Sequence, residues 1–125
     1  MTATFREQAA SNRVVRGVGK PNARLRARLL ERYSRRCVYC GLTLPADQLT
    51  LDHVEPQRIG GDRSEGNLVT CCRPCNREKA GEAAWRYLAR HPEKRETFLS
   101  LATGVWPRLR RAVEEEAAKQ NVRAG

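Results

Sequence analysis

The sequence predicts an α+β fold in which a small, metal-stapled module lies between a basic helix and a helical layer. Two CxxC pairs, Cys37–Cys40 and Cys72–Cys75, enclose two short apolar stretches with strand character. The segments before the first pair and after the second have helical periodicity. The chain has 125 residues, of which only 6% are aromatic, so its core is small. Small cores commonly depend on a metal or a disulfide.

The charge distribution indicates a polyanionic partner. The chain has 24 Lys and Arg residues against 14 Asp and Glu residues, a formal net charge of +10. Residues 1–36 hold ten basic and two acidic residues (+8), residues 37–81 hold five and six (−1), and residues 82–125 hold nine and six (+3). This asymmetry is typical of a nucleic-acid-binding arm beside a nearly neutral module. The alternative is a solvated basic surface without a specific partner.

No membrane segment is expected. No apolar stretch approaches the ~18 residues of a spanning helix, and the N-terminus lacks the continuous apolar region of a secretory signal. We therefore expect a soluble cytoplasmic protein. The composition of the N-terminus, which contains Arg and Ser, is also compatible with an organelle transit peptide.

The first 36 residues divide into two predicted parts. Residues 1–20 are polar and contain Gly, and we expect a mobile basic tail there. Residues 21–36 are predicted as a basic helix, because Leu25, Leu29 and Tyr33 recur on one face at helical spacing. The basic row of that helix, which we expect to contact phosphates, consists of Arg24, Arg28, Arg32 and Arg35.

The segment between the cysteine pairs predicts a hairpin. Residues 49–54 and 67–72 are β-capable, and the loop between them is rich in Pro, Gly and Asp. A short helix should follow, with Pro74 in its first turn and Gly81 as its C-terminal stop. The chain after this helix predicts two or three further helices broken at Pro and Gly, with apolar side chains such as Trp106 in the core.

Five cysteines in an intracellular chain favour a metal site over a disulfide framework. The CxxC pairs are separated by 31 residues, and each can present two sulfurs to one Zn²⁺ ion in a closed, structural site. A rival register uses Cys71 with Cys75. We favour Cys72, because it repeats the two-residue spacing and leaves Cys71 as a small core residue. The alternative is that these are redox pairs or unrelated buried thiols.

Polar side chains gather around the same hairpin. Asp52 and His53 end the first predicted strand, Asn67 opens the second, and Asn76 follows the last cysteine. A closed zinc site would bring Asn76 towards Asp52. A carboxylate with an amide oxygen suits a hard cation such as Mg²⁺, and an imidazole beside it suits general-base catalysis. Taken alone, an Asp-His pair is usually part of a turn, and Asn67 is open to the same interpretation.

Residues 37–81, from "CVYCG" through "LDHVEPQRIGGDRSEGNLVTCC" to "RPCNREKAG", resemble the HNH endonucleases of the zinc-stabilised branch. The resemblance implies a treble-clef-like ββα-metal core with four zinc ligands, Cys37, Cys40, Cys72 and Cys75. It implies that His53 is the general base and that Asn67 braces the hairpin loop. Asp52 and Asn76 would ligate one catalytic divalent cation, Mg²⁺, Mn²⁺ or another. Asn76 stands where many members have His, so the pattern is HNN.

The implied function is metal-dependent hydrolysis of DNA phosphodiesters, which nicks one strand and leaves 5′-phosphate and 3′-hydroxyl ends. RNA is a less favoured substrate. Such a nuclease must be restrained by sequence specificity, low activity or an inhibitor, so an unidentified protein partner is one expectation. Arg58, Arg77 and Lys79 are further candidates for nucleic-acid contacts, or else solvated charges. The rival interpretation is a non-catalytic zinc module that binds nucleic acid. The predicted organisation is completed by a nuclease core at 37–81 and a helical extension at 82–125.

Overall fold

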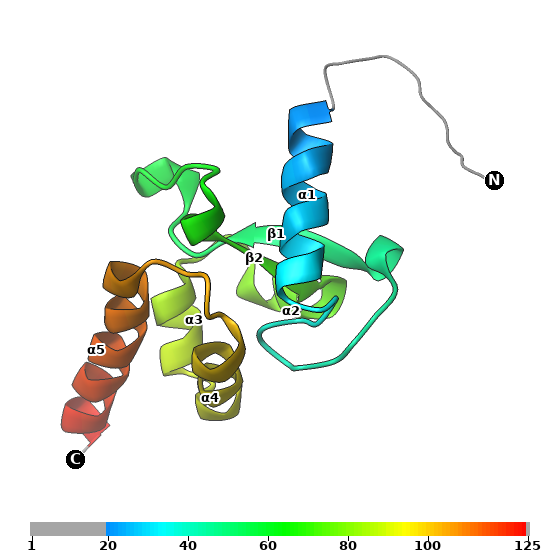
Figure 1. Ribbon diagram of the computed structural model, residues 1–125. Coiled ribbons are helices and arrows are strands. Elements are labelled where there is room, and N and C mark those ends of the chain that lie inside the picture. Colours follow the sequence, from blue (N-terminus) through cyan, green and yellow to red (C-terminus); the bar gives the residue numbers. More distant parts are fainter. Residues whose placement is uncertain (1–19, 125) are drawn as a thin grey trace.

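The computed structural model describes residues 20–124, so residues 1–19 of the predicted tail lie outside the described part. The described part contains two strands and five α-helices, which Figure 1 labels. They are α1 (Lys20–Arg32), β1 (Leu49–His53), β2 (Leu68–Cys72), α2 (Arg73–Lys79), α3 (Ala84–Ala89), α4 (Pro92–Leu101) and α5 (Pro107–Ala124). The predicted α+β class is confirmed.

The sheet is a single antiparallel hairpin. Leu49 pairs with Cys72 at one end and His53 pairs with Leu68 at the other. Helix α2 packs on both strands, α1 packs on β2, and α3 packs on α4 and α5. In Figure 1 the last three helices form a group to one side of the hairpin and away from α1. The hairpin is therefore the element that connects the basic helix to α2.

Helix α1 is shorter than the sequence predicts. Leu25, Leu29 and Tyr33 are buried as expected, but the helix ends at Arg32. Ser34 and Arg35 both have a φ of 54°, and the Arg35 amide donates to the Leu30 carbonyl over 2.9 Å. This is a left-handed helix ending made without glycine. Arg35 consequently lies outside the helical row that was predicted for it.

The hairpin and α2 follow the sequence closely. Cys72 caps α2 and its sulfur accepts from the Cys75 amide, while Pro74 lies in the first turn. The helix ends with Ala80 and Gly81 in left-handed conformations, at φ values of 54° and 79°. The predicted stop at Gly81 is therefore one residue beyond the observed C-cap.

Aromatic packing joins the cysteine knuckle at residues 37–40 to the C-terminal helices. The ring of Tyr39 stacks on Phe98 at 5.7 Å and meets Tyr87 edge-on at 5.5 Å. Trp106, by contrast, was expected in the core and is 36% exposed. A Cβ atom on Gly66 would lie 2.0 Å from the Trp106 indole nitrogen, so the indole covers the backbone of the hairpin loop. This close approach requires glycine at position 66.

Candidate functional site

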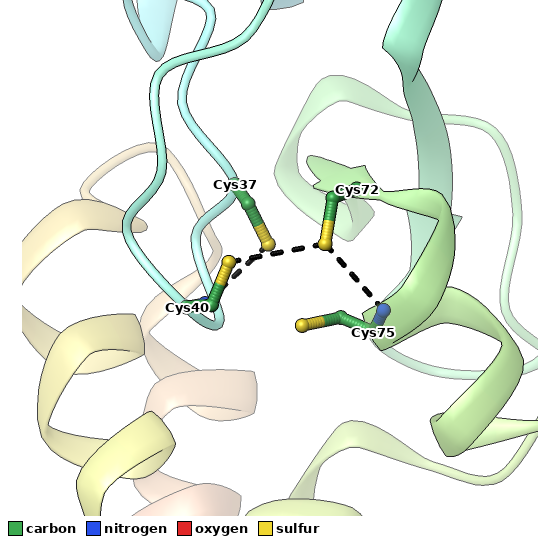
Figure 2. A group of neighbouring side chains, drawn as sticks. All are labelled: Cys37, Cys40, Cys72 and Cys75. Atoms are coloured by element: carbon green, nitrogen blue, oxygen red, sulfur yellow. Dashed lines mark hydrogen bonds between the residues drawn. The ribbon is translucent and has the colours of Figure 1, made fainter.

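The four predicted zinc ligands come together in the structure. Cys37 and Cys40 project from the knuckle, and Cys72 and Cys75 project from the junction of β2 with α2 (Figure 2). All four sulfurs lie within 4.8 Å of one another, and Cys40 Sγ is 3.8 Å from Cys72 Sγ. Zn–S bonds of ~2.3 Å in a tetrahedron place sulfurs about 3.8 Å apart. The geometry thus fits one structural zinc ion.

Hydrogen-bond donors lie around the sulfurs of the cluster. The Cys40 amide donates to Cys37 Sγ over 3.4 Å, and the Lys94 ammonium donates to Cys75 Sγ over 3.5 Å. The hydrogen bond from Cys75 lowers the pKa of the Cys37 thiol to about 4 and raises the pKa of Cys75. Cys71 is buried and is not part of the cluster. The structure therefore agrees with the choice of Cys72 over Cys71.

Asp52 is held by two buried donors. Asp52 is 7% exposed, and its carboxylate accepts a 2.7 Å hydrogen bond from the Tyr39 hydroxyl. The ammonium of Lys79 lies 3.2 Å from Oδ1 and 3.1 Å from Oδ2, and it also donates to the His53 carbonyl over 3.1 Å. Burial, reinforced by the charge of Asp52, holds the pKa of Tyr39 well above its ordinary value, so its hydroxyl remains a donor.

Lys79 is buried, whereas the sequence predicted an exposed position for it. The sequence placed it on an exposed helix face as a candidate phosphate contact, but its side chain is only 1% exposed. Burying an ammonium is costly unless it is paired with an anion and hydrogen-bonded. The pairing with Asp52 explains why this residue points inward from α2. Lys79 and Tyr39 are site residues that sequence reasoning did not identify in this role.

His53 is half-buried at the end of β1. Its Nε2 atom is buried and has no hydrogen-bond partner among the described residues. Burial lowers the pKa of the imidazole, and the charges of Arg63 and Lys79 act in the same direction, against the opposing effect of Asp52. The ring is therefore neutral at pH 7, the protonation state that a general base requires.

Asp52 and His53 open onto one cleft of about 320 Å³. The residues that line it are Asp52, His53, Pro56, Gln57, Arg58, Lys79 and Gly81. Asn76 is half-buried on α2 and is not among these lining residues. The structure thus places Asp52 and His53 together at the cleft. The amide of Asn76, which was expected beside them, does not line it.

Asn67 lies beneath the loop that follows His53. Its side-chain oxygen accepts from the Glu55 amide at 2.8 Å, and its nitrogen donates to the carbonyls of Glu55 and Asp62 at 3.0 and 2.9 Å. The residue is fully buried. From the C-terminal layer, Arg108 adds a 3.0 Å ion pair to the Glu55 side chain. The loop at the cleft is therefore fixed from two sides.

The candidate arginines occupy several positions around the module. Arg28 and Arg32 extend from α1 to Glu65 of the hairpin loop, at 2.7 and 3.6 Å. Arg58 lies at the cleft and donates to the Gly81 carbonyl over 3.4 Å. The remaining candidates are all exposed: Arg24, Arg35 and Arg77.

Across residues 20–124, no helix combines the length and apolar character needed to cross a membrane.

Comparisons with known proteins relate this chain to nucleases. The HNH endonuclease family matches residues 37–92, which extends beyond α2 to include α3. A CRISPR-associated endonuclease Cas9 from Actinomyces naeslundii is 42% identical over 52 residues, which are 39% of this chain and 5% of that protein. The crystal structure of the Type II-C Cas9 enzyme from the same organism superposes with a TM-score of 0.55 at 26% identity.

That superposition covers 74% of this chain but only 11% of the Cas9 chain. The present chain therefore corresponds to a small part of these relatives. Within the module around the cysteines and the hairpin, the family match, the paired cysteines and the Asp-His at the cleft coincide. Residues 37–92, the segment that forms the cysteine cluster and the cleft, therefore match the HNH endonuclease family.

Proposed function

We propose that this protein is a metal-dependent endonuclease that nicks DNA, with the reaction at the cleft of Asp52 and His53. The observation that carries the proposal is the neutral, half-buried imidazole beside a buried carboxylate, at the hairpin end of an HNH segment. The four cysteines support it as a structural zinc site that holds the knuckle to α2. A second divalent ion, Mg²⁺ or Mn²⁺, would be the catalytic one.

The residues around the cleft fit such a cation in part. Asp52 offers a hard oxygen ligand, and Asn76 on the adjacent helix is the proposed second ligand, which requires its amide to turn towards the cleft. When bound, the cation would stabilise charge on the phosphate and on the departing 3′-oxygen. Of these two proposed ligands, Asp52 lines the cleft and Asn76 does not, so the proposal for Asn76 rests on the family pattern.

His53 would take a proton from the attacking water. Burial lowers the pKa of the imidazole, so one ring nitrogen keeps a lone pair that can receive this proton. Attack on phosphorus opposite the 3′-oxygen then leaves 5′-phosphate and 3′-hydroxyl ends. Asn67 contributes by fixing the loop that begins two residues after His53.

DNA is the proposed substrate because the part of the chain that precedes the module in sequence is strongly basic. Residues 1–36 carry +8 of the formal charge, and neutralised phosphates release counterions and strengthen binding. We assign Arg24, Arg28, Arg32 and Arg35 to the phosphates that flank the cut. Arg58 and Arg77, near the cleft and on α2, would contact the scissile strand.

The proposed organisation has a nuclease core at residues 37–81, preceded by the basic helix and followed by a helical extension. The extension would act as a support, because Arg108 and Trp106 hold the hairpin loop. A binding module without catalysis is the second candidate. It would use the same cysteines and arginines, but it gives no physical reason for an unpartnered imidazole at a cleft beside a buried carboxylate.

The test is nicking of supercoiled plasmid by the zinc-loaded protein with Mg²⁺ or Mn²⁺. The wild type should produce relaxed circles, and His53→Ala should lose at least ~10²-fold in rate, the lower range of general-base catalysis. The matched control is His91→Ala, which removes the only other histidine and should retain activity. Salt-sensitive DNA binding without cleavage under any metal would instead establish the binding module, and cleavage of RNA alone would change the substrate.

A further inference from the structure

The ammonium of Lys79 already occupies the carboxylate that the proposed catalytic cation needs. It lies within 3.2 Å of both Asp52 oxygens and also binds the His53 carbonyl. Both charged side chains are nearly inaccessible, at 1% and 8% exposure. The pair is therefore a desolvated internal salt bridge, in which neither charge is screened by water to the extent of a surface pair.

The side chains that line the cleft do not add the negative charge that a divalent cation needs. The charged side chains that line it are Asp52, Lys79 and Arg58, so the lining carries one negative and two positive charges. The other carboxylates of this loop do not line the cleft: Glu55 is paired with Arg108, Glu65 is paired with Arg28, and Asp62 accepts from the Ser64 amide. Mg²⁺ is usually held by one or two carboxylates together with substrate phosphates. Without a substrate, this cleft offers a divalent cation no net negative charge.

We infer that Lys79 makes binding of the catalytic cation conditional on DNA. In the free protein the ammonium supplies the positive charge that Asp52 requires, and a divalent cation is repelled. A scissile phosphodiester in the cleft adds negative charge, provides Lys79 with a second anionic acceptor, and releases the carboxylate to the metal. This inference rests on the proposed function, because it assumes that the cleft receives a phosphodiester.

The direct measurement is a Mn²⁺ titration of the zinc-loaded protein, in which free Mn²⁺ is followed by electron paramagnetic resonance. A His53→Ala background prevents cleavage when duplex DNA is present. We expect Mn²⁺ to bind at least tenfold more tightly with the DNA than without it. In Lys79→Met on the same background, affinity without DNA should rise about tenfold, and the gain from DNA should shrink. Asp52→Asn should abolish the tight binding.

Two controls separate charge from folding. Lys119→Met removes the same charge from an exposed site on α5 and should leave every Mn²⁺ affinity unchanged. Zinc content and thermal unfolding show whether Lys79→Met is folded; if it is not, Lys79→Gln, which retains a hydrogen-bond donor, replaces it. The comparison of the folded Lys79 parent with and without DNA needs no substitution at Lys79.

Equal Mn²⁺ affinity of that parent with and without DNA would overturn the inference, as would a folded Lys79→Met protein with unchanged or weaker affinity in the absence of DNA. Either result leaves plasmid nicking as an independent test of the nuclease. Conversely, DNA-dependent Mn²⁺ binding in a wild-type protein that never nicks would support the role of Lys79 and reject the proposed reaction.

Discussion

The hydroxyl of Tyr39 donates a 2.7 Å hydrogen bond to the carboxylate of Asp52, so a residue between two candidate zinc ligands holds the carboxylate at the cleft. Tyr39 belongs to the knuckle that presents Cys37 and Cys40. Its ring is fully buried against Phe98 and Tyr87. The position of Asp52 therefore depends on the closed knuckle as well as on the strand that carries it.

Tyr39→Phe should damage the site more than the fold. Hydrogen bonds to charged groups contribute about 1.5–3 kcal/mol, so the unfolding free energy should fall within that range while zinc remains bound. We expect nicking to slow at least tenfold and the Mn²⁺ concentration for half-maximal activity to rise, because Asp52 loses a hydrogen bond that orients its carboxylate. The assays are thermal unfolding and plasmid nicking across a metal series.

Tyr33→Phe is the matched control for that substitution. Its hydroxyl is buried and has no hydrogen-bond partner among residues 20–124, so its removal should leave both the metal dependence and the activity unchanged. An unaltered metal dependence in Tyr39→Phe, together with a loss of stability, would show that Tyr39 serves packing alone.

The two adjacent cysteines at the end of β2 should respond differently to substitution. Cys72→Ala removes a candidate ligand, and because structural zinc contributes folding free energy, the protein should lose zinc and unfold. Cys71→Ala removes a buried thiol outside the cluster and should cost only about 1 kcal/mol with one zinc per chain retained. Metal analysis and circular dichroism make the comparison. Loss of zinc from Cys71→Ala would contradict the ligand set.

Local sequence patterns predicted the hairpin and the helix that follows it. Alternation and turn residues located both strands, and Pro74 and Gly81 bracketed α2. The end of α1 could not be predicted in this way, because Ser34 and Arg35 adopt a left-handed conformation that glycine usually marks. Trp106 was misplaced for a related reason: its neighbour is the backbone of Gly66, 40 positions earlier in the chain.

The site was predicted only where spacing carries information. The repeated CxxC spacing favoured Cys72, which lies in the cysteine cluster, and the family pattern pointed to Asp52 and His53, which line the cleft. The partners of Asp52 were missed because they are specified by tertiary contacts from the knuckle and from α2. A lysine one helical turn after the last cysteine gives no local sign that it is buried. The Lys79 side chain points inward because it forms an ion pair with Asp52 on β1.

Asn67 should be as important for catalysis as for stability. Asn67→Ala removes one acceptor and two donated hydrogen bonds from the loop, and each buried group left unpaired costs about 1–3 kcal/mol. We expect the unfolding free energy to fall by roughly 2–4 kcal/mol and kcat to fall further than KM changes. The control is Asn121→Ala on the exposed side of α5. A folded variant with wild-type kcat would exclude a positioning role.

The pH dependence of nicking should report the environment of His53. The ordinary pKa of the imidazole is 6.5, and burial lowers it in the folded protein. Since the neutral ring is the base, activity is lost only as the pH falls through this lowered value, so the acid limb of kcat/KM should lie below pH 6.5. A divalent cation at Asp52 would lower the pKa further, in the same direction. In Arg63→Gln, the loss of a nearby positive charge should move the limb upwards, whereas His91→Gln should leave it in place. A limb above pH 6.5 in the wild type would assign the base to another group.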